Sequence, residues 1–194
     1  MLGTGLEEFG IIDDELPQLL ARKKTERKHE VESHHARTPQ DELVKTLERV
    51  ALFAGLLPTH LIRIAKLARK VELRKGDSLF SHGDAADGLY LVVEGAVRIS
   101  RSAAGIGEEA LAILRDGQHF GEMSVIDDDA TRSADAFCHE RAQLLMFPKE
   151  DLRDLMFVDR ELAYELLWRF VRTLSGRLRD SNDRLMMLTS SAKF

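Results

Sequence analysis

The spacing of apolar positions changes twice along the chain, and these changes separate two helical regions from a strand-rich region between them. Between residues 41 and 68 apolar side chains recur at intervals of three and four, with a break at Ala54-Gly55. Pro58 is well placed to begin the second of two helices. The pattern therefore predicts a helical pair that precedes a sheet.

From Val71 onward the spacing becomes two, which is the period of a half-buried strand. Short apolar runs are separated by turn signals rich in Gly and Asp, including one at 94–95, and no helical pattern lies between them. Such strands indicate an antiparallel β-roll, similar to a jelly roll, rather than a parallel sheet. The predicted strands cover 71–73, 78–80, 89–93, 96–99, 111–114, 133–137 and 143–147.

Beyond Pro148 the helical period returns, with a short helix predicted over 151–156 and a long one from 159 to about 188. One row of apolar residues on the long helix, formed by Leu162, Leu166 and Phe170, is suited to packing on the roll. The predicted fold class is therefore α+β: an antiparallel β-roll flanked by an N-terminal helical pair and a long C-terminal helix.

A second apolar row on the long helix alternates steps of four and three, which is the spacing of a coiled-coil seam with one polar position. We expect this seam to pair with its copy in a homodimer through residues 167–188. A single wide stripe packed on its own domain is the alternative. The seam consists of Leu167, Val171, Leu174, Leu178, Ser181, Leu185 and Leu188.

Residues 1–40 differ in composition from the rest, because two short apolar clusters are followed by an almost wholly charged run over 22–37. We interpret them as a charged arm, with the apolar clusters as a docking segment for a protein partner or for the protein's own domain. His34-His35 lack further ligands nearby, so no metal site is expected there. The expected domains are the arm at 1–40, the helical hairpin and β-roll at 41–157, and the long helix with a short tail at 158–194.

The composition of the 194-residue chain, 44% hydrophobic and 31% charged, is typical of a soluble globular protein. No apolar run is long enough for a membrane span, and the first residues are acidic where a signal peptide is basic, so we expect a cytoplasmic protein without membrane contact. A net charge of −5 argues against a dedicated nucleic-acid surface. The single cysteine, Cys138, lies in a strand-like run and is expected to be a buried small hydrophobe.

Residues 120–134 carry the most specific chemistry of the chain. They open with Phe120-Gly121-Glu122 and close with Arg132-Ser133-Ala134, with one short helical turn between. A glycine lets a backbone N–H approach a ligand closely, and an arginine can bind a phosphate through two parallel hydrogen bonds. Glu122 can accept sugar hydroxyls, so the segment fits a cradle for a small anion. An acidic surface loop with an ordinary ion pair is the alternative.

The order of helical pair, β-roll, cradle and long helix resembles the cyclic nucleotide-binding domain, the module shared by catabolite activator protein and the regulatory subunits of protein kinase A. The resemblance covers about residues 43–188. Its strongest part is the phosphate-binding cassette of that family, in which Phe-Gly-Glu and a short helix precede Arg, a small residue and Ala. The segments Gly83-Asp84 with Leu89-Tyr90, and Glu94-Gly95 before Val97, agree with it more weakly.

The resemblance implies a role for individual residues. Arg132 would pair with the cyclic phosphate, Glu122 would accept the ribose 2′-hydroxyl, and the long helix would touch the base. At that last point Arg177 departs from the hydroxyl residues of the activator, so the choice between cAMP, cGMP and other cyclic nucleotides stays open. The implied ligand-binding residues are Phe120, Gly121, Glu122, Met123, Ser124, Arg132, Ser133, Ala134, Leu174, Arg177 and Leu178.

These features predict a stand-alone receptor for cAMP or cGMP, with cAMP favoured, that signals by repositioning its C-terminal helix or its N-terminal arm. Too few residues follow Leu188 for a DNA-binding domain, so none is expected. Metal-dependent β-roll chemistry would need converging histidines, whereas His82, His119 and His139 are widely separated, so neither enzyme activity nor a cofactor is expected. A dimeric structural adaptor with a nucleotide-free pocket is the alternative function.

Overall fold

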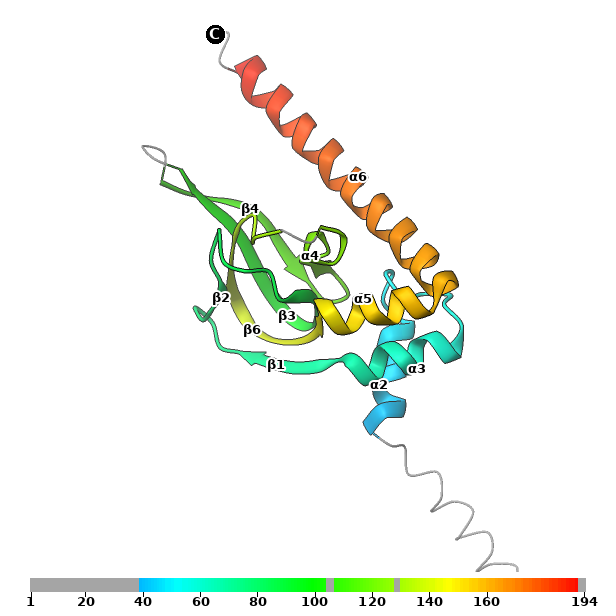
Figure 1. Ribbon diagram of the computed structural model, residues 1–194. Coiled ribbons are helices and arrows are strands. Elements are labelled where there is room, and N and C mark those ends of the chain that lie inside the picture. The colour runs from blue at the N-terminus through cyan, green and yellow to red at the C-terminus, as the bar shows by residue number, and fades with distance from the viewer. Residues whose placement is uncertain (1–38, 104–106, 128–129, 192–194) are drawn as a thin grey trace, which may run out of the picture. The chain divides into compact units, whose positions relative to one another are not determined.

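The computed structural model describes residues 39–103, 107–127 and 130–191 (Figure 1). The residues from Gln40 onward form one compact unit. The expectations for the arm, except for its last two residues, fall outside the described residues.

The predicted helical pair is confirmed as α2 (Pro39–Glu48) and α3 (Pro58–Leu67). Pro58 occupies the first turn of α3, where its missing N–H leaves no hydrogen bond unmade. One face of α3 is buried, through Leu61, Ile64 and Ala65. The three-to-four spacing seen in the sequence thus corresponds to the side of the helix that packs inward.

The strands form an antiparallel sheet, which confirms the predicted β-roll. The central order is β1 (Arg69–Leu73), β6 (Asp135–Pro148), β3 (Gly88–Ala103) and β4 (Gly107–Arg115). Two short strands complete it: β2 (Ser78–Phe80) pairs with β6, and β5 (His119–Phe120) pairs with β3. Sequence-distant segments therefore meet on β3 and β6, which carry most of the pairing.

The turn expected at 94–95 is instead a bulge inside the continuous strand β3. The pairing of β3 with β6 shifts register around Glu94 and Ala96. Gly95 has φ +90°, and a Cβ there would lie 2.1 Å from the Arg141 carbonyl oxygen. Only glycine fits this close approach without strain, so the local turn signal was real, but the chain bends without leaving the sheet.

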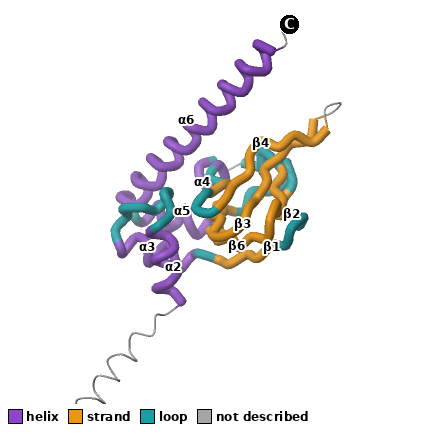
Figure 2. Tube along the Cα trace, turned by 180° about the vertical axis from the view of Figure 1, so that it is seen from behind, coloured by secondary structure: helices purple, strands orange, loops and turns teal. Residues whose placement is uncertain are grey.

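Three helices surround the end of the sheet: α4 (Met123–Ile126), α5 (Lys149–Val158) and the long α6 (Arg160–Ser191). Asp159 joins the last two. Its carboxylate accepts hydrogen bonds from the Leu162 N–H at 3.1 Å and from Arg63 of α3 at 2.7 Å. Figures 1 and 2 show that α6 runs beside the roll on the side of α4 and that its C-terminal part continues past α5.

The predicted apolar row on α6 is buried, as expected. Leu162, Leu166 and Phe170 are each 0% exposed, and they pack in one cluster with α2, α3, α5 and the adjoining ends of the central strands. A second cluster fills the roll itself and contains Tyr90 and Phe120. Because the first cluster ties α6 to the helical pair and to the sheet, the N-terminal half of α6 is a fixed part of the domain.

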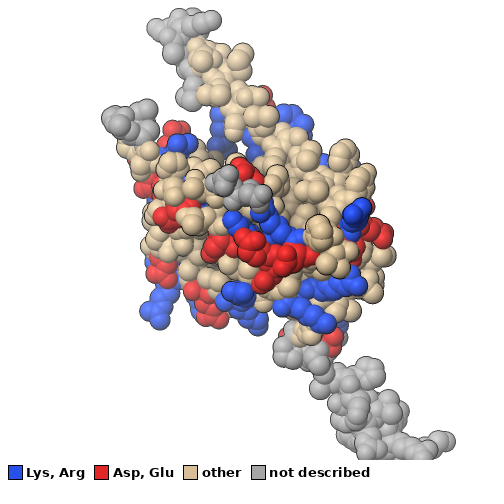
Figure 3. Space-filling model, viewed as in Figure 1, with Lys and Arg blue, Asp and Glu red and all other residues tan. Residues whose placement is uncertain are grey.

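The surface of the described residues is mixed in charge. On the face in Figure 3 basic and acidic side chains alternate without a continuous basic stripe. In the described part of the chain, no helix combines the length and the apolarity that a membrane crossing requires. Cys138 is 2% exposed and burial raises the pKa of its thiol, which agrees with a small buried hydrophobe.

Candidate functional site

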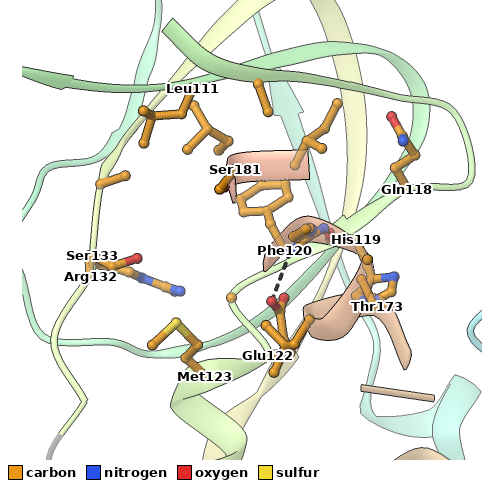
Figure 4. A pocket seen from close by; sticks show the side chains of 18 of the residues that line it. Leu111, Gln118, His119, Phe120, Glu122, Met123, Arg132, Ser133, Thr173 and Ser181 are labelled. Atoms are coloured by element: carbon orange, nitrogen blue, oxygen red, sulfur yellow. Dashed lines mark hydrogen bonds and ion pairs between the residues drawn. The ribbon is translucent and has the colours of Figure 1, made fainter. Parts of the chain in front are cut away.

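A pocket of about 710 Å³ lies between residues 120–134, strand β4 and helix α6 (Figure 4). The cassette residues form one wall, and apolar side chains of β4, including Leu111 and Ile113, form another. Polar residues from one face of α6 close it. Three segments that are distant in sequence therefore share one cavity.

Gly121 lets the cassette backbone come close to Arg132. Its φ is +83°, and a Cβ at this position would lie 2.6 Å from the Gly88 carbonyl oxygen and 2.7 Å from Arg132 Nη1. The hydroxyl of Ser124 donates to the Gly121 carbonyl at 2.7 Å and fixes the start of α4. The glycine of the motif is thus required by both backbone conformation and space.

Arg132 is the central cation of the pocket and is only 4% exposed. Its backbone is held by hydrogen bonds with Asp84 and Gly83, both at 2.8 Å. The guanidinium Nη2 forms an ion pair with Asp87 and donates to the Gly88 carbonyl at 3.1 Å. The Nε atom is buried and has no hydrogen-bond partner.

Asp87 is held in turn by Tyr90. The Tyr90 hydroxyl donates to Asp87 Oδ2 at 2.9 Å. Burial raises the pKa of Tyr90, and the Asp87 carboxylate adds to this effect, so the phenol remains a neutral donor. The side chain of Asp87 itself is 55% exposed. The counter-ion of Arg132 is therefore oriented by the sheet but still accessible to water.

Glu122 is the second buried charge and is 3% exposed. Its Oε1 accepts a hydrogen bond from Arg177 Nη1 at 2.8 Å, while Oε2 has no partner. Arg177 also donates to the carbonyl oxygen of His119. Figure 4 shows Glu122 and Arg132 reaching into the pocket toward one another. The pocket thus has a buried carboxylate and a buried guanidinium, and each has one polar atom without a hydrogen-bond partner.

His119 lies beside the Arg177 contact and is 6% exposed. Burial lowers the pKa of its imidazole to about 4, and the neighbouring Arg177 charge contributes to this shift. At neutral pH the ring is therefore uncharged, and it packs against Phe170 with a centroid distance of 6.2 Å.

The structure brings the predicted site residues together with one exception. The cassette residues, Leu174 and Arg177 all line the pocket, whereas Leu178 does not and is 62% exposed. Arg177 contacts Glu122 in this structure, and its contact with a base stays a prediction. Asp127 is exposed at the end of α4.

Several pocket residues were not identified from the sequence. Phe80, which lines the pocket, looked like an ordinary strand residue, and Asp87, which pairs with Arg132, looked like part of a turn. A signal did exist on the long helix, where polar residues at intervals of four, three and four run through the predicted Arg177. The residues that join Arg177 in this row are Thr173, Asp180 and Arg184, and all of them line the pocket.

No group of three or more His, Cys, Asp or Glu side chains among the described residues is arranged to hold a metal ion. The polar groups of the pocket are instead arginine, carboxylate, hydroxyl and backbone groups. Such a set is suited to an organic anion that also carries hydroxyl groups.

Comparison with known proteins gives a consistent result. Residues 70–159 match the family model of the cyclic nucleotide-binding domain. A CRP-like cAMP-activated global transcriptional regulator of Mycobacterium tuberculosis is 29% identical over 139 residues, covering 72% of this chain and 60% of the relative. The cyclic AMP receptor protein of Thermus thermophilus is 34% identical over 142 residues, covering 71% and 62%.

Solved structures agree with this. The N-terminal domain of a transcriptional regulator from Streptomyces coelicolor is 33% identical, with a TM-score of 0.59 over 72% of this chain and 94% of that domain. The Thermus thermophilus catabolite activator protein is 34% identical, with a TM-score of 0.61 over 71% of this chain and 62% of that protein. The chain belongs to the cyclic nucleotide-binding domain family. It spans about three fifths of the length of the curated relatives named above.

The space beside Gly121 provides a first prediction. Gly121→Ala should lower the free energy of unfolding more than Gly117→Ala, by a further roughly 1–3 kcal/mol. Both glycines have a similar positive φ, but a Cβ at Gly117 meets nothing within 4 Å, so this variant carries only the backbone strain. Urea denaturation of the two variants measures the difference, and equal losses would contradict the predicted steric clash.

The lowered pKa of His119 provides a second prediction, which concerns the pH dependence of stability. The unfolded chain takes up the proton near pH 6.5 and the folded protein only near pH 4, so between these values the unfolded state binds more protons. Stability should therefore fall as the pH is lowered from 6.5 to 4, by about 3 kcal/mol from this residue. Urea denaturation at several pH values should show a smaller loss for His119→Phe than for wild type. Parallel pH profiles would show that His119 is not responsible.

Proposed function

We propose that this protein is a receptor for a cyclic nucleotide, with cAMP favoured over cGMP, and that ligand binding repositions α6. The proposal is supported above all by Arg132 and Glu122, which are buried in one pocket wall and each keep a polar atom without a partner. Unsatisfied buried polar atoms are unfavourable, and a ligand that offers both an anion and a hydroxyl would relieve both. A cyclic nucleotide carries these two groups close together.

The preference for cAMP is supported by the relatives rather than by the pocket. The Mycobacterium tuberculosis regulator is described as cAMP-activated, and the Thermus thermophilus protein as a cyclic AMP receptor. At the cassette, the ligand phosphate would replace Asp87 as the partner of Arg132. Because Asp87 is half exposed, its carboxylate can return to water when the phosphate takes its place.

Nucleotide binding would also affect the position of α6, through Glu122. Arg177 of α6 occupies one oxygen of this carboxylate, so a ribose hydroxyl at Glu122 must share the group with Arg177 or displace it. A ligand shifts a conformational equilibrium only through its different affinity for the two states, and this contact provides such a difference. Arg184 also ties α6 to β4, by a 2.7 Å hydrogen bond to the Leu111 carbonyl.

The partner that we propose for α6 is a second copy of the chain. The seam residues Leu167, Val171, Leu178 and Leu185 are between 41% and 62% exposed. Exposed apolar residues at heptad spacing are the pattern of a helix that pairs with its copy. The side chain of Leu188 lies outside the described part of the structure. The apolar clusters of residues 1–40 are a second candidate, for contact with another protein.

One observation favours the alternative function, a dimeric adaptor with a nucleotide-free pocket. Both buried charges already have protein partners, Arg132 with Asp87 and Glu122 with Arg177. Because each buried charge is paired with an opposite charge of the protein, the pocket does not require a ligand to be stable. Direct binding measurements separate the two functions.

Replacing Arg132 tests the proposed binding of a cyclic nucleotide. Arg132→Leu removes the strong phosphate partner and should weaken nucleotide binding by about 2–5 kcal/mol, or roughly 30-fold to several-thousand-fold in Kd. Isothermal titration calorimetry with cAMP and with cGMP measures this loss. Arg98→Leu is the matched control, because Arg98 pairs with Glu108 and does not line the pocket. Wild-type affinity in Arg132→Leu would refute the proposed phosphate site at Arg132, and a wild type that binds neither nucleotide would favour the adaptor.

A charge in the seam tests the homodimer. Leu178→Asp should shift the protein toward the monomer in light scattering, because a carboxylate would be buried in an apolar interface. Met187→Asp changes the charge equally at an exposed position of α6 outside the heptad seam, so it should leave the dimer intact. A wild-type protein that is monomeric at all concentrations tested would contradict the proposed pairing.

A further inference from the structure

Three aromatic rings from three different strands form a compact group beneath the cassette. Tyr90 of β3 and Phe120 of β5 are stacked, with a centroid distance of 5.3 Å and an interplanar angle of 11°. Phe80 of β2 lies 6.0 Å from each of these rings and is tilted against both. Tyr90 and Phe120 are also direct partners in the pairing of β3 with β5, so the sheet holds the group in place.

The guanidinium of Arg132 rests on this group. Its central carbon lies 4.1 Å from the centroid of the Phe80 ring and 5.3 Å from that of Tyr90. A cation over the face of an aromatic ring is attracted by the negative charge of that face, and the attraction grows as water is excluded. Arg132 is almost fully buried, so the contact with Phe80 acts in a largely water-free setting.

The polar contacts of Arg132 do not by themselves fix the plane of its guanidinium group. Nη2 is bound to Asp87 and to the Gly88 carbonyl, which anchors one corner of the guanidinium. The guanidinium is thus held at two points, through the hydrogen bonds of Nη2 and through the bond from Nε to the side chain, and its plane can still turn about the line between them. The face of Phe80 lies 4.1 Å from the central carbon, where it opposes this rotation.

We propose that Phe80 is a positioning residue for anion binding: its ring face fixes the plane of the Arg132 guanidinium before a ligand arrives. A long arginine side chain loses much conformational freedom when it binds, and fixing it in advance reduces the entropy lost on binding. A leucine at this position would fill a similar space but offers no ring face. The inference rests on the proposed function, because the anion is the phosphate of the cyclic nucleotide.

The first test uses the ligand-free protein, so it does not depend on nucleotide binding. The Nε–H resonance of Arg132, assigned by its loss in Arg132→Lys, should be shifted upfield by the Phe80 ring in the wild type. This shift should be lost in Phe80→Leu and in Phe80→Met, and retained in Phe80→Tyr. Two aliphatic variants are used so that poor folding of one of them leaves the test complete.

The second test measures affinity. Calorimetry with cAMP should show binding weakened by about tenfold in Phe80→Leu and nearly unchanged in Phe80→Tyr. Phe137→Leu is the matched control, since Phe137 is also a half-buried phenylalanine of the sheet with an arginine, Arg98, over its ring at 5.7 Å, but it does not line the pocket. It should bind cAMP as the wild type does.

The outcomes separate this inference from the proposed function. An unmoved Arg132 resonance in Phe80→Leu overturns the positioning role, as does equal weakening of binding in Phe80→Leu and Phe137→Leu. If the wild type binds neither cAMP nor cGMP, the proposed function fails. A lost ring-current shift in the free protein would then still establish that the Arg132 guanidinium lies over the Phe80 ring.

Discussion

The ion pair between Arg132 and Asp87 is the interaction on which the geometry of the pocket depends. A guanidinium that is 4% exposed needs a counter-ion and hydrogen-bond acceptors, because removing a charge from water without compensation is very unfavourable. The counter-ion is the Asp87 carboxylate, directly before β3, and an acceptor is the carbonyl of Gly88, the first residue of β3. Gly121 leaves the space that the guanidinium occupies. Several residues of the site thus serve the placement of one cation.

The second charge pair connects this site to the rest of the molecule. Glu122 belongs to the cassette and Arg177 to α6, so the helix is attached to the pocket by a group with which a ligand would also interact. The N-terminal half of α6 is held differently, by apolar packing of Leu162, Leu166 and Phe170 in the core. Apolar packing does not respond to a polar ligand, whereas an ion pair at the pocket does. Movement of α6 on binding would therefore start near Arg177 and affect the part of the helix that carries the exposed seam residues Leu178 and Leu185.

Most elements of the fold were predictable from the spacing of apolar residues, because burial imposes the helical and strand periods directly. The turn predicted at 94–95 was wrong, because Gly95 marks a bulge and β3 continues through it. A bulge and a turn both need a glycine with positive φ, and only the pairing with β6 distinguishes them. In the same way, two predicted strands proved to be the single strand β6.

By itself the sequence determined the fold class and the residues of the cassette, because Phe120 to Glu122 and Arg132 to Ala134 are close enough in the chain to act as one motif. Tertiary structure alone decided what surrounds them. Asp87 lies 45 residues before Arg132, and Arg177 lies 55 residues after Glu122. Phe80 comes under Arg132 because strand pairing gathers β2, β3 and β5 around one end of the roll. Partners of a buried charge are selected by proximity in space, which local periodicity does not encode.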